Sequence, residues 1–146
     1  MLPCVRGVFR WLSATLFVTV VVQVGLAGYG AFDAIHAANS TSVSKKTIES
    51  GFNAHAVVGT LIVLLMLIVL MVAAVGQLGP TAIRRSAEIF ALGIVQMVLG
   101  IVSTEAPALG FLHTVNALAI TGATGLLAHR TWTAQRGADG VAATVG

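Results

Sequence analysis

The sequence predicts an all-α integral membrane protein, a four-helix antiparallel bundle made of two helical hairpins related by a pseudo-two-fold axis. The chain of 146 residues is 57% hydrophobic and only 9% charged, whereas soluble domains carry about 25% charged residues. It also contains four apolar runs, and short sequence elements of the first two runs recur in the last two.

Each apolar run is long enough to cross about 30 Å of hydrocarbon at about 1.5 Å per helical residue. The expected spans cover residues 8–31, 53–76, 83–103 and 109–128. They form one transmembrane domain over residues 1–130, and the small residues of the tail 131–146 predict disorder. Segment 32–51, rich in Asn, Ser and Thr, is expected to be a flexible or partly helical loop.

The first apolar run has a second interpretation, a secretory signal peptide, because Arg6 and Arg10 precede most of it. Two features favour a membrane helix instead. The run is longer than a usual signal core, and its segment 23–28 recurs in the third run.

The basic residues predict that both termini are cytoplasmic, because cytoplasmic ends of membrane helices carry the excess of Lys and Arg. Only Lys45 and Lys46 lie on the opposite side. Six others lie on the side of the termini: Arg6, Arg10, Arg84, Arg85, Arg130 and Arg136. The sequence therefore predicts a multi-pass protein of the cytoplasmic membrane. Its scattered charges indicate no nucleic-acid partner.

The repeated elements are Gln-x-x-Leu-small at 23–28 and 96–100, and Gly-Phe followed by His at 51–55 and 110–113. Two hairpins of the same direction are naturally related by a two-fold axis along the membrane normal. The second and fourth helices then occupy opposite corners of the bundle, each with one histidine near the outer face at about the same depth.

His55 and His113 are the central functional candidates, because ionisable residues within membrane spans are costly. The alternative is that each merely bonds a carbonyl or water near the interface. Gly59 and Ala117 follow them by one helical turn, which leaves a shallow surface beside each imidazole for a planar macrocycle.

Gln96 and Gly100 lie at helical spacing on the third helix, and polar Gln96 should face inward. Close packing of helices explains such small residues, and clearance for a flat ligand is the other explanation.

A helix spacing of about 10 Å gives a diagonal of about 14 Å, which suits two imidazoles on one central iron with a porphyrin between them. A bare zinc or copper ion would need more ligands. The only cysteine is Cys4, so no Cys-x-x-Cys-His motif exists and the cofactor is expected to be non-covalent haem b, with His55 and His113 as metal ligands.

Gln96-x-x-Leu99-Gly100, then Pro107 and His113-x-x-x-Ala117, resembles the third and fourth helices of one half of a haem A synthase. Each half of that family has four helices and offers a haem one histidine from the second and one from the fourth. The chain also resembles small bacterial four-helix membrane proteins with a Phe-x-x-His and a Leu-His pair. The resemblance implies haem binding through His55 and His113.

The sequence departs from the synthases where their second helix has Glu three residues before the histidine and Arg directly after it. Phe52 and Ala56 stand at these positions. We therefore expect haem binding without methyl oxidation of haem, and no catalytic residue is assigned.

Other polar residues have simpler explanations. His36 is expected in the solvated first loop, His129 at an inner helix end where a cation suits the helix dipole, and Glu105 in a loop near the proposed site. Lys45 and Lys46 are surface charges that could also neutralise haem propionates.

The leading functional hypothesis is a haem-b protein of the membrane that serves electron transfer, haem handling or sensing. The alternatives are a small transporter or channel, and a non-catalytic accessory subunit without cofactor. The expected partners are lipid and haem, and a homodimer or a membrane redox partner.

Overall fold

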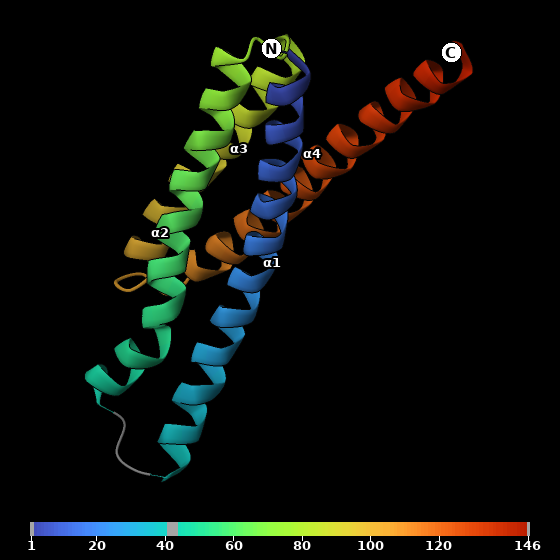
Figure 1. Ribbon diagram of the computed structural model, residues 1–146. Coiled ribbons are helices and arrows are strands. Elements are labelled where there is room, and N and C mark those ends of the chain that lie inside the picture. The colour runs from blue at the N-terminus through green and yellow to red at the C-terminus, as the bar shows by residue number, and fades with distance from the viewer. Residues whose placement is uncertain (1, 41–43, 146) are drawn as a thin grey trace.

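The computed structural model describes residues 2–40 and 44–145, with side chains described for 4–39 and 44–134. Its four helices are α1 Leu2–Ser40, α2 Lys45–Val75, α3 Pro80–Val102 and α4 Leu109–Val145 (Figure 1). Each helix contacts two neighbours in the ring α1, α2, α3, α4, so α1 and α3 lie on one diagonal and α2 and α4 on the other. The predicted fold class, an all-α four-helix bundle, is confirmed.

All four helices are long and apolar enough to cross a membrane. Their large apolar side chains point outward as well as inward: Leu61, Ile101 and Leu118 are all more than half exposed. In hydrocarbon, helices satisfy their own backbone polar groups, and an apolar exterior is what lipid requires. The chain is therefore a multi-pass membrane protein.

The core is a seam of side chains spaced alternately three and four residues apart, the spacing that keeps one helix face turned toward its partners. Large residues fill it toward the end of the bundle that holds the N-terminus. The buried residues of this part of the bundle are Phe9, Ser13, Leu16 and Val20 of α1, Ile62, Met66, Val69 and Ala73 of α2, Ser86, Ile89 and Gly93 of α3, and Ile120, Thr124 and Leu127 of α4, while Gly30 and Gly51 are buried beyond the cavity.

The seam has the same register in both hairpins. Ser13 and Leu16 of α1 are followed 73 positions later by Ser86 and Ile89 of α3, and all four are buried. The buried residues of α4 follow those of α2 by 58 positions in the same way, Ile120 after Ile62 for example. This register supports the interpretation of the chain as two copies of one helical hairpin, whose helices are joined by loops of different length.

The turn between α2 and α3 lies at the same end of the bundle as the N-terminus (Figure 1). Gln77 and Gly79 adopt positive φ angles of 48° and 97°, and Pro80 begins α3. Glycine adopts such angles at little cost, and proline suits the first helical position because it lacks the unpaired N–H.

The first hairpin is longer than the sequence predicts. α1 continues to Ser40 and α2 starts at Lys45 with Ser44 as its N-cap, so most of the expected loop 32–51 is helical, while residues 41–43 lie outside the described chain. Helix–helix packing explains the difference: a Cβ on Gly30 would lie 2.9 Å from Phe52 Cδ1, and a Cβ on Gly51 2.9 Å from Asp33 Oδ2. These glycines let α1 and α2 stay in close contact beyond the apolar run.

α4 is also longer than predicted, because residues 131–145 continue its helix where the sequence predicts a disordered tail. Trp132 packs edge-on against Trp11 with ring centroids 5.1 Å apart, and the Arg10 guanidinium lies 4.5 Å from the Trp132 centroid. Arg10 Nε is buried without a hydrogen-bond partner among the described residues. Ring contacts therefore tie α4 to α1 at Trp132, which hydropathy alone does not reveal.

Replacing Trp132 with Ala should destabilise the bundle by about 1–3 kcal/mol, the combined value of one aromatic pair and one partly desolvated cation–π contact. Unfolding of the purified protein in detergent micelles measures this. Thr133→Ala is the control, because the exposed Thr133 hydroxyl donates only to carbonyls of its own helix. Equal stability of the two variants would mean that the ring cluster contributes nothing.

Candidate functional site

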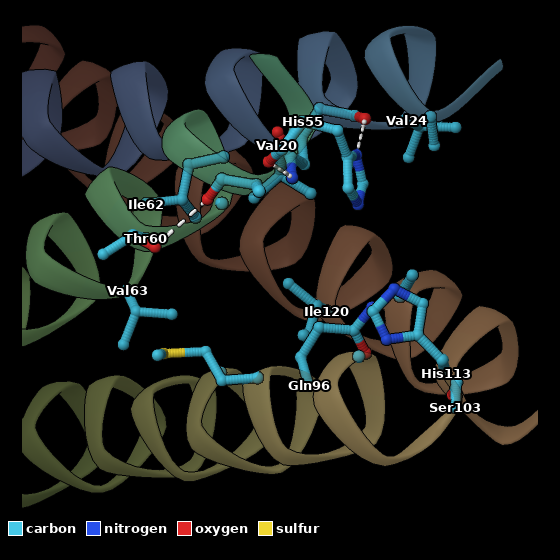
Figure 2. A pocket seen from close by; sticks show the side chains of 18 of the residues that line it. Val20, Val24, His55, Thr60, Ile62, Val63, Gln96, Ser103, His113 and Ile120 are labelled. Atoms are coloured by element: carbon cyan, nitrogen blue, oxygen red, sulfur yellow. Dashed lines mark hydrogen bonds between the residues drawn. The ribbon is translucent and has the colours of Figure 1, made fainter. Parts of the chain in front are cut away.

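A cavity of about 800 Å³ opens among the four helices, next to the filled part of the core (Figure 2). Its walls come from α1, α2, α3 and α4, and none of the residues that line it is an Asp, Glu, Lys or Arg. All six site residues predicted from the sequence line this cavity: His55, Gly59, Gln96, Gly100, His113 and Ala117.

The cavity exists because the core seam continues with small and polar residues. On every helix the spacing of alternately three and four residues continues without interruption into the cavity wall. It starts there from the buried Val20, Ile62, Gly93 and Ile120. The next seam positions are Gln23 and Ala27 on α1, Gly59 and His55 on α2, Gln96 and Gly100 on α3, and Ala117 and His113 on α4. Two consecutive levels therefore lack the large apolar side chains that close the bundle elsewhere.

His55 on α2 is held by α1 through two hydrogen bonds. Its ring Nδ1 lies 3.2 Å from the backbone oxygen of Gln23, and the Gln23 side-chain amide donates to the His55 carbonyl at 2.7 Å. A carbonyl only accepts, so this bond places the proton of neutral His55 on Nδ1. The Nε2 lone pair is then available, an arrangement common in metal-binding histidines.

His113 on α4 is held by α3 in a different way. Its Nε2 lies 3.0 Å from the Gln96 side-chain Nε2, and the Gln96 Oε1 accepts a hydrogen bond from Asn116 at 2.8 Å. His113 Nδ1 is buried and has no hydrogen-bond partner among the described residues. Each hairpin therefore pairs a glutamine of its first helix with the histidine of its second, but through different atoms.

The two imidazoles approach each other across the cavity (Figure 2). Their centroids are 6.3 Å apart and their planes meet at 62°. They come from α2 and α4, which lie on a diagonal of the bundle, as the repeat predicts. This separation also falls within the range of an edge-to-face aromatic pair. The distance between the rings therefore indicates a ligand site only together with the cavity around them.

The glycines of the site make room for side chains of the site itself. A Cβ on Gly59 would lie 2.8 Å from Gln23 Nε2, and a Cβ on Gly100 would lie 3.3 Å from His113 Cε1. The sequence predicts Gly59 as open surface beside His55. In the structure Gly59 lines the cavity, and it also admits the Gln23 amide that bonds the His55 backbone.

The remaining polar candidates do not line the cavity. Lys45 lies 3.7 Å from Glu49 with 91% of its side chain exposed, and Lys46 and Glu105 are exposed as well. His36 and His129 are exposed on α1 and α4, so His36 lies on a helix and not in the predicted loop. Within the described residues, no group of three or more His, Cys, Asp or Glu side chains could hold a metal ion.

Three further residues belong to the site. Phe52 lines the cavity with its ring edge-on to His55, the centroids 6.4 Å apart. Gln23 lines it through the bonds described above, and Asn116 supports Gln96 from α4. The spacing of 73 residues between Gln23 and Gln96 was the available signal for Gln23. Nothing in the sequence indicates which atoms these amides bond.

Comparisons of the chain with models of protein families, with curated proteins and with solved structures give no match. The resemblance of residues 96–117 to haem A synthases therefore stays a prediction.

Proposed function

We propose that this chain binds one haem b in the cavity between its four helices, with His55 and His113 as the two axial ligands, on the side of the membrane opposite the termini. The observation that carries the proposal is the pair of imidazoles 6.3 Å apart in one cavity of about 800 Å³. His55 is already in the tautomer that leaves Nε2 free.

The distance between the ring centroids suits one metal ion between them, once His113 Nε2 has turned from Gln96 toward the cavity. With metal–nitrogen bonds of about 2.0–2.1 Å and a ring radius of about 1.1 Å, two imidazoles on opposite sides of one ion have centroids about 6.3 Å apart. The two ring planes need not be parallel in such an arrangement. Because the described residues offer no third metal-binding side chain nearby, the other ligands would have to come with the metal, as the four porphyrin nitrogens do.

The chemistry of the cavity wall also suits a large, mostly apolar ligand. Pockets of about 300–1,000 Å³ bury most of a small-molecule ligand, and this wall is mainly apolar, formed by aliphatic side chains, glycines and Phe52, with no Asp, Glu, Lys or Arg. The polar residues Ser103, Thr104 and Thr114 gather where α3 ends and α4 begins. The propionates would point out of that end, since carboxylates have no partner deeper in the bundle.

Haem bound in this way supplies a one-electron iron couple, which fits electron transfer, haem handling or sensing. This chain's residues contribute position and surroundings: the Gln23 carbonyl fixes the tautomer of His55. Phe52 stands where the resemblance to haem A synthases would place the acid for haem oxidation. The transporter and accessory-subunit hypotheses predict purified protein that stays colourless after haem supply.

Replacing either predicted ligand should change the spectrum of the haem-loaded protein from low spin towards high spin, because the iron loses its sixth ligand. Loss of even an outer-shell partner costs about 10–100-fold in metal affinity, so His55→Ala and His113→Ala should weaken haem retention by at least about tenfold. Absorption spectra of protein purified from haem-supplied cells measure both effects, and the double variant should bind no haem.

His36→Ala and His129→Ala are the controls, because both histidines are exposed and lie outside the cavity. Free imidazole added to His55→Gly or His113→Gly should restore the low-spin spectrum, which a merely misfolded variant would not allow. Unchanged low-spin spectra and full haem content in both Ala variants would refute the proposal.

Filling the cavity at Gly59 should exclude haem while both ligands stay in the chain, although it also displaces the Gln23 amide from the His55 carbonyl. In Gly59→Leu the new Cβ would lie 2.8 Å from Gln23 Nε2, and both residues line the cavity, so the added side chain should take up cavity space and haem content should fall several-fold. Leu stabilises a helix by about 1 kcal/mol relative to Gly, so the helix itself is not weakened. Gly122→Leu is the matched control, because Gly122 is exposed with open space around it. Normal haem content in Gly59→Leu would place the ligand elsewhere.

A further inference from the structure

The hydrogen bonds around Gln96 have only one consistent direction. Asn116 Nδ2 lies 3.0 Å from the backbone oxygen of Leu92 and 2.8 Å from Gln96 Oε1. The Leu92 carbonyl only accepts, so the Asn116 atom facing it must be the amide nitrogen. That nitrogen then needs an oxygen on Gln96, and the Gln96 nitrogen is left to face His113.

This direction fixes the state of His113. The Gln96 amide donates to His113 Nε2 at 3.0 Å, so Nε2 has no proton and neutral His113 carries its proton on Nδ1. Its Nδ1 is buried without a partner among the described residues. The hydrogen bond therefore occupies the Nε2 lone pair of His113, while the Nε2 lone pair of His55 stays free.

We propose that the Asn116–Gln96 pair is a latch on His113, so that His55 binds haem iron first and His113 joins only after Gln96 releases it. The inference rests on the haem-binding function proposed above. Gln96 and Asn116 are positioning residues in this scheme, and the two axial ligands are not equivalent. His55 is the permanent ligand, and His113 is the exchangeable one whose side of the iron admits competing small ligands.

Gly100 leaves the latch room to open. A Cβ at this position would lie 3.3 Å from His113 Cε1 and 3.5 Å from Nδ1. Partial rotation of the ring about its Cβ–Cγ bond carries Nε2 away from Gln96, and the missing Cβ at residue 100 leaves space for Cε1 and Nδ1 to move. The corresponding residue of the first hairpin is Ala27, where the His55 ring is held by a backbone carbonyl and has no side-chain latch.

The latch itself is tested on haem-free protein, labelled with ¹⁵N-histidine, in detergent micelles. Imidazole nitrogen shifts should show His113 protonated on Nδ1 in the wild type, and this preference should be lost in Gln96→Leu. Asn116→Ala removes the anchor of Gln96 and should act in the same direction, which covers the case that Gln96→Leu does not fold. His113 protonated on Nε2 in the wild type would overturn the proposal.

The order of binding is tested by mixing each protein with haemin and recording the Soret band over time. The wild type should pass through a high-spin species before it becomes low-spin, and loss of one hydrogen bond should make the second phase about threefold to tenfold faster in Gln96→Leu. Carbon monoxide should also displace His113 less readily from the reduced variant. Asn53→Leu, which removes an exposed amide outside the cavity, is the control and should follow the wild type.

The outcomes separate the two proposals. A low-spin product that forms at equal rates in the wild type and Gln96→Leu refutes the latch and leaves haem binding intact. A wild type that never develops a haem spectrum refutes the proposed function, and the order of ligation falls with it.

Discussion

The bundle depends on one constraint: only the side chains of the core seam can fill the space between the four helices. Large residues close it toward the N-terminal end. At the next two levels the seam holds Gly, Ala, Gln and His, and a cavity results. Bringing helices together in lipid gains little from the hydrophobic effect, so packing and interhelical hydrogen bonds must hold them. The glutamines supply such bonds where apolar contacts are missing.

The fold class and the diagonal placement of the two histidines were predictable from the sequence. Hydropathy locates four spans, and the repeated Gln-x-x-Leu-small and Gly-Phe-His elements place His55 and His113 on diagonal helices. The structure confirms the four-helix bundle and brings the two rings to one cavity. The offsets between matching seam positions, 73 residues from α1 to α3 and 58 from α2 to α4, are present in the sequence as well. They become apparent only when the buried positions are known.

Other features could not be predicted because they arise from contacts between helices. The extension of α1 and α2 depends on the close approach of the two helices at Gly30 and Gly51. The continuation of α4 beyond residue 130 depends on the contacts of Trp132 with Arg10 and Trp11. Hydropathy predicts that a helix ends where its apolar run ends, whereas tertiary contacts stabilise further helical turns. The different partners of the two histidines were equally hidden, because they depend on which amide atoms face each ring.

The two-fold repeat has a consequence for how a ligand would act on the fold. Each hairpin holds one histidine, so a group bound by both His55 and His113 joins the two halves across the diagonal that has no backbone contact. A ligand that binds only the folded state stabilises it by an amount that grows with its concentration relative to its dissociation constant. Under the proposed function, haem is thus a structural link between the hairpins as well as a cofactor. Under the latch proposed for His113, this link would form from the α2 side, with α4 completing it.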